Sequence, residues 1–128
     1  MPTVSSPLIA AADAPVFSLP SVKFTGLAAP SRGAAETSVW MVEIEPNTDG
    51  APHSLTREEI FVALEGRARA TLAGVDYELE PGCGFIVPPE TAFSLANPYA
   101  EPFRAVAVLP VGGEARVEGE TFVPPWAR

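Results

Sequence analysis

The stretch GAPHSLTREEIFVALEG, residues 50–66, decides the fold and raises the question of function. It contains the only histidine of the chain, His53, and six residues later Glu59, which leads into the apolar run at residues 60–64 and a turn at Gly66. A continuous apolar run bounded by a turn predicts a strand that is covered on both faces. The histidine beside it is a candidate metal ligand, a candidate proton-transfer group, or a core residue.

Short runs of alternating hydrophobicity surround this stretch and predict an all-β fold. In SVWMVEIEP, residues 38–46, Trp40 and every second residue after it are apolar, which predicts a strand with one buried face. RARATL and VDYELE, residues 67–72 and 75–80, alternate on either side of Ala73-Gly74 and predict a hairpin. Further short runs follow up to residue 123, and none predicts a long amphipathic helix. Roughly eight or more strands in one small domain predict a sandwich or a closed barrel.

Length and composition limit the possible functions. With 128 residues, 47% of them hydrophobic, the chain fits one domain with one proper core, and its 15 prolines and 10 glycines favour many turns. A formal net charge of −8 without a basic stripe excludes nucleic acid and anionic membrane surfaces as expected partners. The single cysteine, Cys83, excludes an internal disulfide and a cysteine-rich zinc site.

The chain divides into an arm and a domain. The first twenty residues are biased toward proline, alanine and serine and lack a basic leader, so residues 1–20 are expected to form an N-terminal arm rather than a signal peptide or a membrane span. Residues 21–128 are expected to form a single domain. We therefore expect a cytoplasmic protein.

Two sets of spaced residues resemble the motifs of the cupin family. The first family motif runs Gly, five residues, His-x-His, three or four residues, Glu, six residues, Gly. In this chain His53, Glu59 and Gly66 occupy three of these positions, whereas Asn47 stands where the first Gly belongs and Leu55 where the second His belongs.

The second family motif runs Gly, five residues, Pro-x-Gly, two residues, His, three residues, Asn. Here Gly82, Pro88 and Asn97 match in register, whereas Glu90 replaces the second Gly and Phe93 replaces the His. The resemblance covers roughly residues 35–110. It implies an all-β cupin jelly-roll β-barrel, also called a double-stranded β-helix.

The resemblance also implies a metal site, which the substitutions damage. A cupin metal is usually held by three imidazoles and one carboxylate, and here only His53 and Glu59 remain, because Leu55 and Phe93 offer no lone pair. Two protein ligands make a weak site for a transition metal. We therefore expect no resident cofactor, with a divalent transition metal on His53 and Glu59 as the alternative.

The pair His53 and Glu59 has two interpretations. It is either a structural pair at the barrel mouth, or the catalytic and ligand-anchoring pair of a pocket lined by Trp40, Leu55, Phe61 and Phe93. For each of these aromatic side chains, core packing is the alternative to ligand contact. In a dry pocket, a neutral histidine accepts a proton near neutral pH and a nearby carboxyl serves as the acid.

Three functions stay open, and all have a small organic molecule as the partner. The first is a metal-independent isomerase, cyclase or lyase, the second a non-catalytic binding or sensing module, and the third a metal-dependent oxygenase or isomerase with an incomplete ligand set. The sequence leaves open whether the protein is an enzyme. The resemblance also implies a homodimer, formed through sheet faces and N-terminal arms, which is consistent with apolar side chains such as Met41 on the strand face opposite Trp40.

Overall fold

The computed structural model describes residues 7–128, so the first six residues of the expected arm lie outside the described residues. The described chain is all-β, with three single-turn 3₁₀ helices. Its strands are β1 (Val16–Leu19), β2 (Val22–Ala28), β3 (Thr37–Ile44), β4 (Ser54–Leu55), β5 (Glu59–Glu65), β6 (Ala68–Leu72), β7 (Val75–Leu79), β8 (Gly84–Val87), β9 (Phe93–Ala96), β10 (Phe103–Pro110), β11 (Ala115–Val117) and β12 (Glu120–Phe122). The 3₁₀ turns are η1 (Ala11–Asp13), η2 (Pro30–Arg32) and η3 (Pro125–Ala127).

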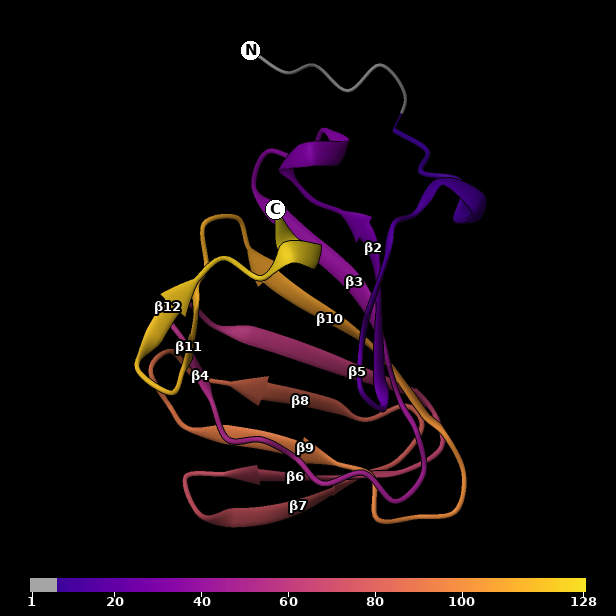
Figure 1. Ribbon diagram of the computed structural model, residues 1–128, viewed down its shortest axis with the longest axis vertical. Helices are drawn as coiled ribbons and strands as arrows, with labels where there is room; N and C mark the ends of the chain where they lie inside the picture. The colour runs from indigo at the N-terminus through magenta and orange to yellow at the C-terminus, as the bar shows by residue number, and fades with distance from the viewer. Residues whose placement is uncertain (1–6) are drawn as a thin grey trace.

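The strands form three antiparallel sheets arranged as a barrel. The large sheet has the order β1-β2-β3-β10-β5-β8, and two smaller sheets have the orders β12-β11-β4 and β7-β6-β9. In Figure 1 the large sheet runs from β2 and β3 down to β8, with β6, β7 and β9 below it and β4, β11 and β12 to the left. Strand β10 lies between β3 and β5, far from both in sequence, as a jelly roll requires. The expected all-β jelly-roll barrel is confirmed.

Alternation along β3 and β10 builds the inner wall of the barrel. On β3 every second residue is buried, including Trp40 and Val42, and on β10 the buried set contains Ala105 and Ala107. Ala107 lies in register with Trp40 on one side and with Phe61 of β5 on the other. Because alanine is small, the two large rings have room beside it, and the interior does not fill completely.

Strand β5 differs from its expected environment. The apolar run predicted a strand covered on both faces, but only the side chains of Glu59, Phe61 and Ala63 are buried, whereas Val62 and Leu64 are 38% and 40% exposed. That prediction is wrong, because β5 lies in a sheet with only one face on the core. Its outward apolar side chains belong to a surface and not to the interior.

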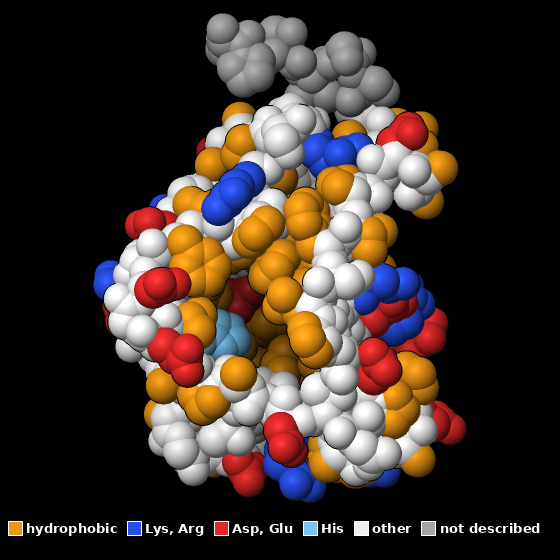
Figure 2. All heavy atoms as spheres, viewed as in Figure 1, with side chains coloured by type: hydrophobic (Ala, Val, Ile, Leu, Met, Phe, Trp, Pro, Cys, Tyr) orange, Lys and Arg blue, Asp and Glu red, His pale blue; other side chains and the backbone are white. Residues whose placement is uncertain are grey.

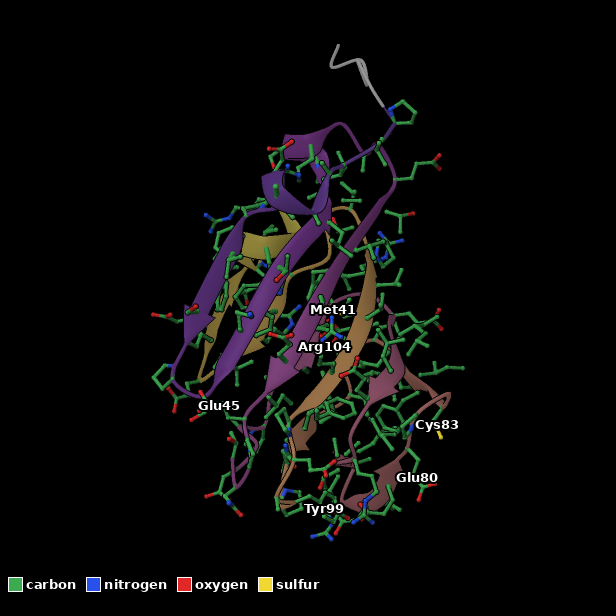
Figure 3. All side chains as sticks on the ribbon, turned by 90° about the vertical axis from the view of Figure 1, so that its right-hand side faces the viewer. Met41, Glu45, Glu80, Cys83, Tyr99 and Arg104 are labelled. Atoms are coloured by element: carbon green, nitrogen blue, oxygen red, sulfur yellow. The ribbon has the colours of Figure 1, made fainter. Side chains whose placement is uncertain are left out.

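The outward side of the large sheet carries ordered rows of side chains. Val39, Val108, Ile60 and Ile86 are aligned across four strands, and Met41, Val106 and Val62 are aligned across three. We call these seven residues together with Leu64 the outer apolar face. A third row is ionic: Glu43 forms ion pairs with Lys23 at 2.8 Å and with Arg104 at 2.9 Å, and Arg104 also pairs with Glu65 at 2.8 Å. Figure 3 looks onto this face, with Met41 and Arg104 labelled.

Both ends of the chain join the barrel. Within the expected arm, Val16–Leu19 is strand β1 and pairs with β2 in the large sheet. At the other end, Ser38 Oγ donates to the Ala127 carbonyl at 2.9 Å and Ser31 Oγ to that of Arg128 at 2.7 Å, which holds η3 against β3 and η2. Figure 1 shows the C-terminal segment beside β3, as these hydrogen bonds require. None of the helical turns in the described chain is long and apolar enough to cross a membrane.

Candidate functional site

The barrel contains an open cavity of about 500 Å³, which is within the usual range for small-molecule sites. Figure 2 shows it as a hollow with hydrophobic walls and with the histidine at its rim. Its lining is mainly apolar and consists of Leu19, Pro20, Val22, Phe24, Trp40, Val42, Ile44, Thr48, Asp49, Ala51, His53, Leu55, Glu59, Phe61, Phe93, Leu95, Ala115, Val117, Phe122, Pro124 and Trp126. Apart from the two indoles, the polar side chains in this lining are Thr48, Asp49, His53 and Glu59.

The structure brings the six sequence-predicted site residues to this one cavity. His53 and Glu59 line it, and so do the four expected pocket residues Trp40, Leu55, Phe61 and Phe93. Leu55 and Phe93 are each 2% exposed and face inward, at the positions where the family motifs carry histidines. By contrast, the aromatic Tyr77 does not line the cavity and packs on Phe85 near the surface.

Three further aromatic side chains in the cavity wall were not predicted from the sequence. Phe24, Phe122 and Trp126 also line the cavity, and Trp126 stacks on Phe24 with ring centroids 3.6 Å apart and an interplanar angle of 3°. Phe122 and Trp126 follow the last motif position by more than twenty residues, so no motif spacing points to them. The only sequence signal is the apolar FVPPW stretch at residues 122–126.

His53 is held by its backbone and by one ring nitrogen. Its N–H donates to the Phe93 carbonyl at 2.9 Å and its carbonyl accepts from the Phe93 N–H at 2.8 Å. The Nδ1 atom lies 2.9 Å from the Ala51 carbonyl oxygen. Because a carbonyl oxygen only accepts, Nδ1 carries the proton and Nε2 keeps its lone pair. Burial lowers the pKa of His53, against the smaller raising effect of the Ala51 hydrogen bond, so the ring is neutral at pH 7.

Glu59 begins β5 and points into the cavity. Its side chain is 4% exposed, and it has no hydrogen-bond or ion-pair partner among residues 7–128. Burial raises the pKa of Glu59 to about 8. At pH 7 the group is therefore mainly a carboxylic acid, which donates a hydrogen bond. The neighbouring Glu58 is exposed on the opposite side of the chain, as strand alternation predicts.

The two groups offer opposite proton chemistry in a mainly apolar, open cavity. Nε2 of His53 accepts a proton, and the carboxyl of Glu59 donates one, while residues 7–128 offer no hydrogen-bond partner to either atom. The Phe93 ring packs beside His53 and Phe61, with its centroid 4.3 Å from that of His53 and 5.9 Å from that of Phe61. An acceptor and a donor that line the same cavity are the kinds of group that general acid–base catalysis uses.

The residues present do not fit the metal that the fold family implies. The donor set consists of one imidazole and one mainly protonated carboxyl, and the side chains of Leu55 and Phe93 offer no lone pair. Among the described residues no group of three or more His, Cys, Asp or Glu side chains is placed to hold a metal ion. Three protein ligands are the usual minimum for a catalytic zinc site. We therefore derive no step through a metal.

Several solved structures share this fold at low sequence identity. The polyketide cyclase RemF from Streptomyces resistomycificus superposes with a TM-score of 0.76 at 19% identity, covering 86% of this chain and 83% of that one. A structure of the DMSP lyases RdDddP and RnDddQII gives a TM-score of 0.68 at 23% identity, covering 76% and 52%. The salicylate 1,2-dioxygenase from Pseudoaminobacter salicylatoxidans, solved with gentisate, gives 0.70 at 18% identity, covering 83% and 31%.

These likenesses establish the fold, and the dioxygenase shows that a protein of this fold binds a small organic molecule. No curated protein matches the chain by sequence. Residues 40–109, more than half of the chain, match the Cupin domain family. This segment contains every position of the two motifs and lies inside the jelly-roll barrel described above. The protein therefore belongs to the cupin family.

Proposed function

We propose that the protein binds a small, mainly apolar organic molecule in the barrel cavity and acts on it as a metal-independent isomerase, cyclase or lyase, with His53 and Glu59 as the proton-transfer pair. The observation that carries this proposal is the Glu59 carboxyl, which faces a mainly apolar open cavity without a partner among the described residues. The carboxyl is therefore available to a ligand, and one such hydrogen bond contributes on the order of 0.5 to 1.5 kcal/mol.

The protonation states support catalysis at neutral pH. General acid–base catalysts are most effective when their pKa lies near the working pH, and the pKa of Glu59 is raised to about 8. His53 is neutral, and its Nε2 has no partner among the described residues. A protonated acid and an unprotonated base are therefore both present at neutral pH. The similar folds of a polyketide cyclase and of lyases support the choice of reaction classes.

A non-catalytic binding or sensing module is the second candidate. Among the described residues, His53 and Glu59 form no hydrogen bond with each other, and no charged group orients either side chain. These two absences favour a binding module. In that case the two side chains only anchor a ligand. The third candidate, a metal-dependent oxygenase or isomerase, lacks support from the donor set.

A substrate-trapping experiment separates the first two candidates. Glu59→Gln keeps the shape and the hydrogen-bond donor of the acid but cannot release a proton, so this variant should retain substrate from a small-molecule extract of the source cells, detected by native mass spectrometry. Wild-type protein should convert the retained compound into a product of equal mass, for an isomerase or cyclase, or of lower mass, for a lyase. Return of the compound unchanged would overturn the enzyme in favour of the binding module.

We propose further that two copies associate through the outer apolar face, as the expected homodimer requires. The four charged residues beside this face, Lys23, Glu43, Glu65 and Arg104, sum to zero, although the whole chain carries −8. A neutral face lets two acidic molecules approach each other. A cytoplasmic location, expected from the sequence, stays a prediction.

A further inference from the structure

The substrate class follows from the walls of the cavity, its charges and the two polar groups, and this inference rests on the proposed function. The walls carry two groups of aromatic rings. The first is Trp126 of η3 with Phe24 of β2 and Trp40 of β3, in which Trp126 lies parallel to Phe24 at 3.6 Å and 6.5 Å from Trp40. The second is Phe93 of β9 with Phe61 of β5. Flat rings make the stacked and edge contacts that such walls favour.

The charges exclude ionic substrates. No lysine or arginine is among the cavity-lining residues of the described chain, so a carboxylate or phosphate would enter an apolar site without a counter-ion. Of the two acidic side chains in the lining, Asp49 is exposed at the edge and Glu59 is mainly neutral. A sugar would leave most of its hydroxyl groups without partners, because only four lining residues other than the indoles are polar. The cavity therefore favours an uncharged molecule with few polar atoms.

The two polar groups define what those few atoms are. Glu59 presents a donor, which requires an acceptor such as a carbonyl oxygen, and Nε2 of His53 presents an acceptor, which requires an acidic hydrogen. We infer that the protein enolises uncharged, flat, ring-containing ketones, with the carbonyl oxygen at Glu59 and the adjacent C–H at His53. This assigns the general acid to Glu59 and the general base to His53.

The step balances without a further reactant. Nε2 of His53 removes the hydrogen next to the carbonyl as a proton, and the C–H electron pair forms the carbon–carbon double bond of the enol. The carbonyl π pair moves to oxygen, which takes the proton of Glu59. The enol, an imidazolium and a carboxylate result. Return of the protons in the reverse direction restores the ketone and both side chains. In D₂O the imidazolium N–H of His53 first exchanges with solvent through the open cavity, so that a deuteron returns to the carbon.

The test is deuterium uptake by 2-tetralone, a flat enolisable ketone, in D₂O near neutral pH, followed by mass spectrometry. Wild-type protein should accelerate uptake relative to His53→Gln and to Glu59→Gln, each of which should lose on the order of 10²-fold in rate. Val75→Ala, a change at an exposed position on β7 outside the cavity, should keep the wild-type rate. The aliphatic ketone 2-butanone should exchange at least tenfold less relative to its own background, because it lacks the ring.

Binding of N-phenyl-1-naphthylamine, an uncharged aromatic dye, separates failure of this inference from failure of the proposed function. If the dye binds and 2-tetralone displaces it, but deuterium uptake is the same in wild type and in both variants, the enolisation inference is overturned while the cavity remains a binding site. Equal acceleration of 2-butanone and 2-tetralone would overturn the ring requirement. If neither the dye nor 2-tetralone binds wild-type protein, binding in the cavity itself is overturned.

Discussion

Glu59 contributes a pH-dependent part of the stability of the protein. Its pKa is about 8 in the folded protein, against 4.5 as the ordinary value that it regains on unfolding. The folded state thus binds the proton more tightly, and this contribution to stability is fully present below pH 4.5 and lost as the pH rises through about 8.

We therefore predict that the free energy of unfolding of Glu59→Gln, which cannot titrate, increases relative to that of wild type as the pH rises from 5 to 9. The gain should be on the order of 3 to 5 kcal/mol, measured as the free energy of unfolding in urea at the two pH values. Glu58→Gln, at the exposed residue directly before β5, is the matched control, and its stability relative to wild type should not change comparably with pH. A pH-independent difference between Glu59→Gln and wild type would show that Glu59 is ionised in the folded state.

His53 is predicted to matter more for binding than for folding. His53→Gln keeps a polar side chain of similar reach at the cavity rim, so the melting temperature should change little. Loss of the Nε2 acceptor should weaken the binding of an aromatic ligand that donates a hydrogen bond, such as 2-naphthol, by about 1 to 3 kcal/mol, measured by displacement of the dye. A large fall in melting temperature with unchanged affinity would instead assign His53 a purely structural role.

At the scale of the elements, the turns were easier to predict than the faces of the strands. Gly66 has φ +72°, and a Cβ there would collide with the Pro102 carbonyl oxygen, so this motif position admits only glycine. Asn47 and Glu90 stand where the motifs have glycine and adopt φ of 56° and 57°. The turn conformation is thus kept without glycine, and at Glu90 an ion pair to Arg116 at 2.9 Å accompanies it. The motif spacing therefore predicts the turns even where the residue type differs.

The number of faces on which β5 is buried could not be predicted from its run of apolar residues. Hydrophobicity alone does not separate a strand buried on two faces from one that is buried on one face and exposed as part of the outer apolar face. The contact between Trp126 and Phe24 in the aromatic wall was unpredictable for another reason. Trp126 reaches Phe24 only after the chain has completed the barrel, and such contacts between distant residues leave no local pattern.

Strands β4 and β9 provide a direct test of the inward register. Leu55 and Phe93 are both buried and line the same cavity as His53 and Glu59. We predict that Leu55→His combined with Phe93→His places three imidazoles and one carboxyl around one point and binds Ni²⁺ or Zn²⁺ at least a hundredfold more tightly than wild type. Isothermal titration calorimetry on the folded double variant measures this gain. Val16→His with Val75→His, at exposed positions outside the cavity and the outer apolar face, is the control that should gain nothing comparable.

For the whole molecule, the outer apolar face is the feature that calls for a partner surface. We predict that wild-type protein is a dimer at micromolar concentration and that Val62→Lys with Ile86→Lys makes it a monomer, because two buried like charges would meet across the interface. Light scattering coupled to size-exclusion chromatography gives the mass. Val75→Lys, which places the same charge on an exposed apolar position of β7, should leave the dimer intact. A monomeric wild type, or a dimer lost equally in the control, would contradict the proposed interface.

The two tryptophans of the chain have a practical consequence. Trp40 and Trp126 are its only indoles, and both line the cavity. Indole emission depends on the polarity and the quenching groups around the ring, so a molecule that enters the barrel changes the fluorescence of every tryptophan in the protein at once. Compound libraries can therefore be screened on the unmodified chain in a plate reader, and the Trp40→Phe and Trp126→Phe variants tell which side of the barrel each hit occupies.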